Sequence, residues 1–144
     1  MNDPAAVIDR LATAVRANDA HAAAAIYSED VVIVDPLFDV VGRDAAVVAF
    51  QAWFDAFRVT DLRITDRIVD GDAIAVRWEW TAIHQGEYLG VPASGRPFSS
   101  YNVILFDTRD GEVVRDLSTW DSAQLLRLRE QASGDGTEAD DGGV

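Results

Sequence analysis

The fold is decided by the stretch Ala73-Ile-Ala-Val-Arg-Trp-Glu-Trp-Thr-Ala-Ile-His84. The residues that share one face of it are Ile74, Val76, Trp78, Trp80, Ala82 and His84. The other face carries Arg77, Glu79 and Thr81. Because the side chains of a strand point alternately to its two faces, this period of two predicts a long strand with one apolar face.

The same period appears on both sides of this strand. Leu62-Arg-Ile-Thr65 is typical of a strand, and Asp70-Gly71 is a hairpin signal that joins it to the strand at 73–84. After a Gly/Pro-rich loop we expect strands at 97–106 and 112–120, with a turn at Arg109-Asp-Gly111 between them. The second half of the chain is therefore expected to form a run of long antiparallel strands.

Helices are expected mainly in the first half. Asp3 is a helix cap and Pro4 suits the first helical position. The other expected elements are a short helix at 21–27, a strand at 31–34 ended by Asp35-Pro36, a helix from 42–44 onward whose apolar stripe is Val47, Phe50, Trp53, Phe54 and Phe57, and a last helix with Leu125, Leu126 and Leu128. This order predicts an α+β fold, a conical barrel of a curved, mainly antiparallel sheet with helices on its concave face and a ligand site inside.

Length and composition indicate one domain. The chain has 144 residues and no cysteine, which excludes disulfides, thiolate metal sites and a cysteine nucleophile. We expect the domain to span residues 1–131. Residues 132–144 lack large apolar side chains before Val144 and carry several acids, so we expect a disordered acidic tail.

The chain is strongly acidic, with 12 basic and 25 acidic residues and a formal net charge of −13. Such a charge repels phosphate backbones and anionic lipids, so we expect neither nucleic acid nor a membrane as partner. The sequence also shows no apolar run near the length of a membrane span and no signal-peptide pattern at its start. We therefore expect a cytoplasmic, soluble protein.

Three segments resemble the SnoaL-like polyketide cyclases. They are Gly86-Glu-Tyr-Leu-Gly-Val-Pro-Ala-Ser-Gly-Arg-Pro-Phe98, Asp110-Gly-Glu-Val-Val114 and Thr119-Trp-Asp-Ser-Ala-Gln-Leu-Leu126. That family belongs to the nuclear-transport-factor-2-like superfamily, with the ketosteroid isomerases and limonene epoxide hydrolases, and the resemblance covers about residues 5–130. It implies a ketosteroid isomerase-like cone, often dimeric through the outer face of its sheet, with no metal and no organic cofactor.

Asp35 and His84 are the first candidates for catalysis. Asp35 ends an apolar strand in a Val-Asp-Pro context similar to the general-base region of ketosteroid isomerases, and a carboxylate beside an apolar pocket has a raised pKa. The alternative is ordinary turn chemistry at Asp-Pro. His84 lies on the apolar face of its strand, where it either shuttles protons or is a satisfied core residue.

Asp116 and Ser118 share one face of the expected last strand with Trp120. By resemblance, the family's acid/base aspartate falls at Ser118. A serine hydroxyl cannot accept a proton as a carboxylate does, although it can hydrogen-bond a substrate oxygen. Proton transfer would then fall to Asp35, His84 or Asp116. Asp116 either substitutes from one pleat along the strand or forms an ion pair with Arg115 or Arg77.

Other residues are candidates for binding a substrate. Tyr101 and Asn102 lie on opposite faces of one strand, so only one of them points inward. Asn102 shares a face with Ile104, which favours Asn102 as the inward residue. Most of the aromatic residues are expected in the core, but some line the pocket, with Trp53, Trp80 and Trp120 as candidates.

These features lead to two hypotheses for function. The first is a cofactor-independent cyclase or isomerase, or a hydrolase, that acts by acid/base catalysis on a small apolar, polyketide- or terpenoid-like metabolite. The second is a non-catalytic small-molecule-binding or accessory protein of the same fold, which the serine at position 118 favours. In both cases we expect a homodimer formed through the outer sheet face.

Overall fold

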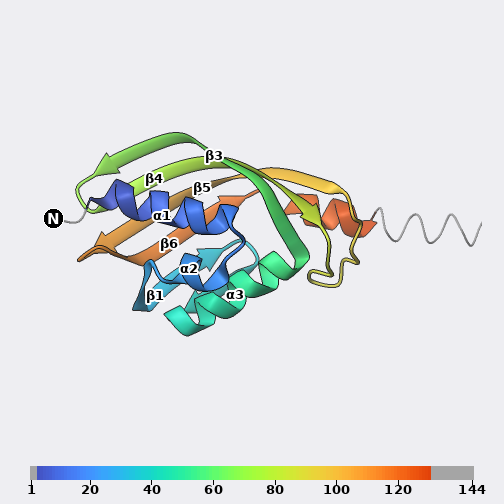
Figure 1. Cartoon of the computed structure of the whole chain (residues 1–144), viewed down its shortest axis with the longest axis horizontal. Helices are drawn as coiled ribbons and strands as arrows, with labels where there is room; N and C mark the ends of the chain where they lie inside the picture. The colour runs from blue at the N-terminus through green and yellow to red at the C-terminus, as the bar shows by residue number, and fades with distance from the viewer. Residues whose placement is uncertain (1–2, 131–144) are drawn as a thin grey trace, which may run out of the picture.

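A computed structural model describes residues 3–130 of the chain (Figure 1). The expected boundary at residue 131 and the expected disordered tail lie outside these residues. The helices are α1 (Pro4–Arg16), α2 (Ala20–Ala24) and α3 (Arg43–Ala56), and residues 123–130 are also helical. The strands are β1 (Tyr27–Asp35), β2 (Phe38–Val41), β3 (Phe57–Asp70), β4 (Ala73–His84), β5 (Pro97–Arg109) and β6 (Glu112–Trp120).

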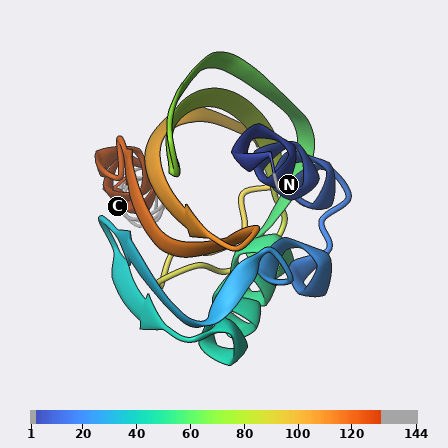
Figure 2. The same cartoon turned by 90° about the vertical axis from the view of Figure 1, so that its left-hand side faces the viewer.

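The strands form a six-stranded sheet in the order β2-β1-β6-β5-β4-β3. Neighbouring strands are antiparallel except for β1 and β6, which are parallel, so the sheet is mixed. Figure 2 shows the sheet curving through a wide arc, with α1 and α3 on its concave side. The expected α+β fold is thereby confirmed, as a strongly curved sheet whose edges, β2 and β3, leave it open.

The alternating strand that decided the fold is the centre of this arrangement. β4 spans Ala73–His84 as expected, and its even-numbered residues are buried. It pairs with β3 on one side and β5 on the other. Register then fixes which residues share the concave face, because Trp78 lies opposite Asn102 on β5. Ser118 of β6 lies opposite Ile104 in the same way.

The structure differs from the local expectations at three places along the chain. The short helix ends at Ala24 rather than residue 27, and Tyr27 instead begins β1, where it pairs with Val113 of β6. Phe57 is not the last residue of the α3 stripe but the first residue of β3, which is much longer than residues 62–65. The strand β2 was not expected at all. In each case long-range strand pairing overrides the local helix or turn preference.

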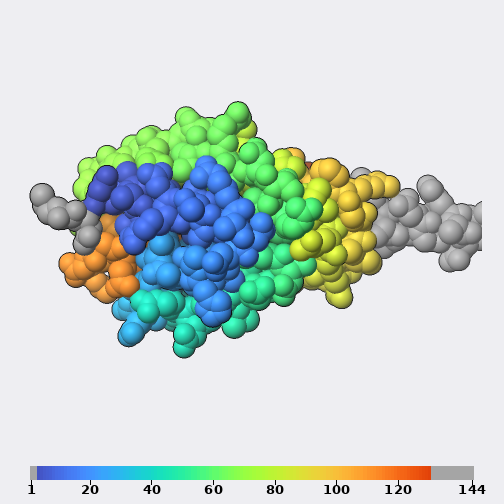
Figure 3. Space-filling model, in the orientation of Figure 1, coloured from blue at the N-terminus to red at the C-terminus, as the bar shows by residue number. Residues whose placement is uncertain are grey.

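The turn between α1 and α2 is fixed to the sheet, which holds α1 over the concave face. The side chain of Asn18 accepts a hydrogen bond from the Val59 amide (2.7 Å) and donates one to the Val59 carbonyl (3.0 Å). Arg16 donates to the carbonyl of Leu62 on the same strand (3.0 Å). Figure 3 shows α1 and α2 packed closely against the neighbouring segments. No helix within residues 3–130 is long and apolar enough to span a membrane.

The loop after β4 lies very close to the end of α3. A Cβ atom on Gly86 would lie 2.6 Å from the carbonyl oxygen of Asp55, so only glycine fits there without movement of the backbone. The amides of Gln85 and Gly86 both donate to the carbonyl of Ala56. This close approach fixes the start of the loop at 85–96, which carries Tyr88 to the concave side of the sheet.

Candidate functional site

A cavity lies between the concave face of the sheet and the helices α1 and α3. Its volume is about 140 Å³, close to the roughly 150 Å³ of an apolar cavity that holds benzene. Most of its lining is apolar and includes Leu11, Phe50, Trp53 and Ile104. The polar side chains that line it are Tyr27, Asp35, Tyr88, Asn102, Asp116 and Ser118. The cavity is thus an apolar site with a few polar groups.

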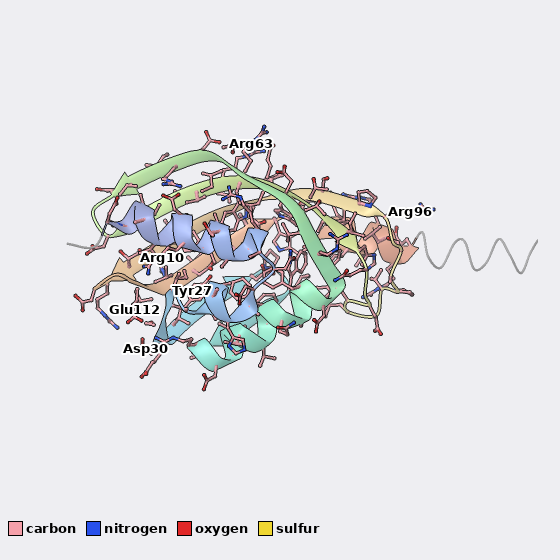
Figure 4. All side chains as sticks on the ribbon, viewed as in Figure 1. Arg10, Tyr27, Asp30, Arg63, Arg96 and Glu112 are labelled. Carbon is pink, nitrogen blue, oxygen red and sulfur yellow. The ribbon has the colours of Figure 1, made fainter. Side chains whose placement is uncertain are left out.

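A buried hydrogen bond connects Tyr27 at the start of β1 to Asp116 on β6. The Tyr27 hydroxyl donates to Oδ2 of Asp116 at 2.6 Å, and the two side chains are 1% and 5% exposed. Figure 4 shows Tyr27 toward the middle of the molecule, whereas labelled charges such as Arg63 and Arg96 lie at its periphery. Oδ1 of Asp116 is buried and has no hydrogen-bond partner among residues 3–130. One carboxylate oxygen is therefore held and the other is unpaired.

Burial raises the pKa of Asp116 to about 7. The Tyr27 hydrogen bond opposes this increase, and the negative charge of Asp35 adds to it. Burial also raises the pKa of Tyr27 well above its ordinary value, so Tyr27 stays a proton donor in this pair. Near neutral pH the Asp116 carboxyl is therefore present in both protonation states.

Asp35 is a second carboxyl group on the cavity wall. It ends β1 and is half-buried, and the indole of Trp120 donates to its Oδ2 at 3.1 Å. The amide of Leu37 donates to its Oδ1 at 3.0 Å. Burial raises the pKa of Asp35, while these two hydrogen bonds oppose the change. Asp35 thus takes part in the Asp-Pro turn and is also the carboxylate at the pocket. The two interpretations of Asp35, as a turn residue and as a pocket residue, are compatible.

The carboxamide of Asn102 joins three other cavity residues. Its Oδ1 accepts hydrogen bonds from the indoles of Trp80 (2.7 Å) and Trp78 (3.3 Å). Its Nδ2 donates to Oγ of Ser118 (3.0 Å). Asn102 therefore faces inward, as strand parity favoured.

Aromatic rings make up a large part of the cavity wall and lie beside these polar groups. Trp53 of α3 meets Trp80, Tyr88 and Trp120 edge to face, with ring centroids 5.3, 5.3 and 5.9 Å apart. All four tryptophans of the chain line the cavity. Burial, and next the charge of Asp35, raise the pKa of Tyr88 to about 12, so Tyr88 presents a neutral hydroxyl. The wall suits a flat apolar ligand.

The structure does not bring His84 or Tyr101 to the cavity. His84 is 1% exposed and stacks on Phe57, with Nδ1 3.1 Å from Oγ of Ser94, and burial lowers its pKa. It anchors the loop at 85–96 from within the core. Tyr101 is 43% exposed on the outer face, where the Arg77 guanidinium lies 4.8 Å from its ring centroid. Neither side chain is among those that line the cavity.

The ion pairs considered for Asp116 do not form. Arg115 instead pairs with Asp107 at 2.6 Å, and Arg77 pairs with Glu79 at 3.0 Å, both away from the cavity. Within residues 3–130, no group of three or more histidine, aspartate or glutamate side chains is arranged to hold a metal ion.

Tyr27 and Tyr88 are cavity residues that the sequence analysis did not single out. Tyr27 follows an alanine-rich segment and was assigned to a helix, although a tyrosine before a β-rich run is an acceptable strand start. Tyr88 lies in a Gly/Pro-rich loop, whose path no periodicity predicts. Only the fold brings these residues to the same cavity as Asp35 and Asp116.

Comparison with known proteins assigns the chain to a family. A sequence model of the SnoaL-like polyketide cyclases matches residues 5–128. The chain belongs to this family. The resemblance noted in the loop and the last strand is thereby confirmed. The sequence matches none of the curated proteins.

Solved structures similar to this SnoaL-like chain include two from Streptomyces. AclR, a proposed hydroxylase from Streptomyces galilaeus, is 25% identical, with a TM-score of 0.74 over 87% of this chain and 83% of AclR. IdmH, a proposed polyketide cyclase from Streptomyces antibioticus, is also 25% identical, with a TM-score of 0.72 over 88% of this chain and 98% of IdmH.

A third structure shows the same fold at lower identity. It is a protein with a ketosteroid isomerase-like fold from Catenulispora acidiphila, in complex with trimethylamine. It is 20% identical, with a TM-score of 0.67 over 86% of this chain and 92% of that protein. This SnoaL-like chain therefore has the ketosteroid isomerase-like fold.

The buried carboxyl group of this SnoaL-like domain predicts a pH-dependent stability. The pKa of Asp116 is about 7 in the folded chain and 3.8 in its ordinary state. Folding favours the protonated form of Asp116. The contribution of this group to the stability of the fold is therefore fully present below pH 4 and is lost as the pH rises through 7. At pH 8.5, Asp116→Asn should therefore be more stable than the wild type, by up to about 4 kcal/mol. At pH 4.5 most of this difference should vanish.

Urea unfolding of both proteins at the two pH values measures this effect. Asp39→Asn, at an exposed position on β2, is the matched control, because it removes the same charge outside the cavity. A difference between Asp116→Asn and the wild type that is equal at both pH values would contradict the raised pKa.

Proposed function

We propose that this SnoaL-like protein is an enzyme that moves protons on a small apolar substrate held in the cavity. The observation that carries the proposal is the Asp116 carboxyl, which has one free buried oxygen and a pKa of about 7. A general acid/base works best when its pKa lies near the working pH, because it can then both accept and return a proton. Tyr27 orients this carboxyl by holding its other oxygen.

In the proposed step, the Asp116 carboxylate accepts a proton from a carbon or oxygen of the substrate and becomes a neutral acid. It then returns this proton to another atom of the same substrate. The net result is an isomerisation or a cyclisation, and no further reactant is needed. A hydrolysis would use the same carboxylate to activate a water molecule. Asp35 is the second proton-transfer group, since its pKa is also raised and it lines the same cavity.

The substrate class is proposed from the cavity and from the family. The aromatic wall fits a flat apolar molecule, and IdmH and AclR are proposed as a polyketide cyclase and a hydroxylase. A polyketide- or terpenoid-like metabolite satisfies both observations. A larger metabolite would place one ring in the cavity and extend from it.

A second candidate function is ligand binding without turnover. The observation that favours it is Ser118, which stands where the resemblance places the family's acid/base aspartate. Only the enzyme function requires a turnover that depends on the ionisation of Asp116. This requirement distinguishes the two functions.

Exchange of the acidic α-hydrogens of phenylacetone in D2O, followed by proton NMR, separates the two functions. The wild type should accelerate the exchange, and Asp116→Asn should lower the catalysed rate by roughly 100-fold or more. Asp35→Asn should move the midpoint of the pH–rate profile to lower pH, because the charge of Asp35 raises the pKa of Asp116.

Asp39→Asn serves as the control and should exchange phenylacetone at the wild-type rate. Full activity in Asp116→Asn would exclude Asp116 as the base. Saturable binding of phenylacetone to the wild type without faster exchange would instead support the binding function.

The outer face of the sheet is the surface that we assign to a homodimer. Apolar side chains on three neighbouring strands are exposed there and form a continuous patch, with Leu117 opposite both Val34 and Leu105. Val34, Leu105 and Val103 are 38%, 38% and 40% exposed. Contiguous exposed apolar surface of this kind is typical of protein–protein interfaces.

Light scattering coupled to gel filtration tests the homodimer. The wild type should elute with twice the mass of one chain, and Leu105→Glu should elute with the mass of one chain, because it would bury a charge in the interface. A wild-type mass equal to one chain would exclude the dimer.

A further inference from the structure

The hydrogen bonds around Asn102 have a direction that follows from the chemistry of the groups. An indole nitrogen can only donate, and both Trp78 and Trp80 direct theirs to the same atom of Asn102. That atom must therefore be the carbonyl oxygen. The two possible orientations of an amide are usually hard to distinguish, but here two donors select one of them.

The orientation of the Asn102 amide in turn decides which atom donates in the hydrogen bond between Asn102 and Ser118. The amide nitrogen of Asn102 can only donate, so the Ser118 oxygen must accept at 3.0 Å. The Ser118 hydroxyl hydrogen must then point elsewhere. In the described part of the chain this is the one side-chain hydrogen bond that Ser118 makes, so its own hydrogen is left without an acceptor.

This free donor lies beside the free acceptor of the cavity. Ser118 and Asp116 are two residues apart on β6, so they share its inward face, and both line the cavity. Hydrogen bonds in a chain polarise one another, so the bonds to Asn102 make Ser118 a stronger donor. Ser118 is half-buried, and a hydroxyl donor that lacks a partner on a largely apolar cavity wall gains free energy when a ligand places an acceptor within its reach.

We infer that Ser118 donates a hydrogen bond to the ligand in this site, and that the site thereby selects an apolar, one-ring-sized group that carries an acceptor oxygen, such as a ketone. This inference rests on the proposed function only in taking the cavity as the ligand site. A hydrocarbon of equal shape would leave the Ser118 hydrogen unpaired and is disfavoured for that reason. Trp80 and Asn102, which belong to the same series of hydrogen bonds, act by positioning Ser118.

Acetophenone and α-methylstyrene test this inference, because they have the same shape and differ by an oxygen in place of a methylene group. Binding is followed by two-dimensional NMR of the indole N–H groups, since all four tryptophans line the cavity. Ser118→Ala should weaken acetophenone binding by roughly 2- to 10-fold and leave α-methylstyrene binding unchanged. Ser118→Thr, which keeps the hydroxyl, should restore the wild-type ratio of the two affinities.

Thr119→Ala is the matched control, because it removes a hydroxyl from the opposite face of the same strand. It should leave the ratio of the two affinities unchanged. A Ser118→Ala protein that keeps the wild-type ratio, or that loses affinity for both ligands equally, would overturn the inference. Since no turnover is measured, this outcome is independent of the exchange experiment, which tests Asp116.

Discussion

The buried hydrogen bond between Tyr27 and Asp116 is the interaction on which the rest of the site depends. It joins residues 89 positions apart, and it does so across β1 and β6, the one parallel pair of strands in the described sheet. A charged carboxylate is costly to bury, and a hydroxyl that donates to it reduces this cost. The same bond leaves the second oxygen of Asp116 without a hydrogen-bond partner among the described residues, in a side chain that lines the cavity. One interaction therefore holds the carboxyl group and leaves its other oxygen unpaired.

The remaining polar groups of the cavity are arranged so that few are free. Asp35 is held by Trp120 and Leu37, and the carboxamide of Asn102 is held by two indoles and a serine. Aromatic rings thus have two roles, because they exclude water and also fix polar side chains through their N–H groups. Hydrogen-bonding capacity remains unused on Oδ1 of Asp116, on the Ser118 hydroxyl and on the Tyr88 hydroxyl, all in side chains that line the cavity. Fixed groups of this kind favour catalysis because they need little rearrangement when charge develops.

The sequence was informative where local pattern determines structure. The period of two placed β4 without error and put Asn102 on the inward face of β5, since both depend only on strand geometry. The sequence pattern failed to predict the structure where pairing between segments distant in the chain determines it. Tyr27 follows an alanine-rich segment, and only its pairing with β6 makes it a strand residue beside Asp116. His84 fitted the inward face by parity, but the loop at 85–96 folds over it and removes it from the cavity.

A carbon-13 NMR titration of the aspartate side-chain carboxyl groups tests the central claim most directly, because it observes the ionisation of Asp116 itself. The resonance missing from Asp116→Asn identifies the group. We expect this resonance to titrate with a midpoint near pH 7, and at a higher pH in Tyr27→Phe, since the Tyr27 hydrogen bond lowers the pKa. An Asp116 resonance that titrates near the ordinary aspartate value of 3.8 would contradict the account.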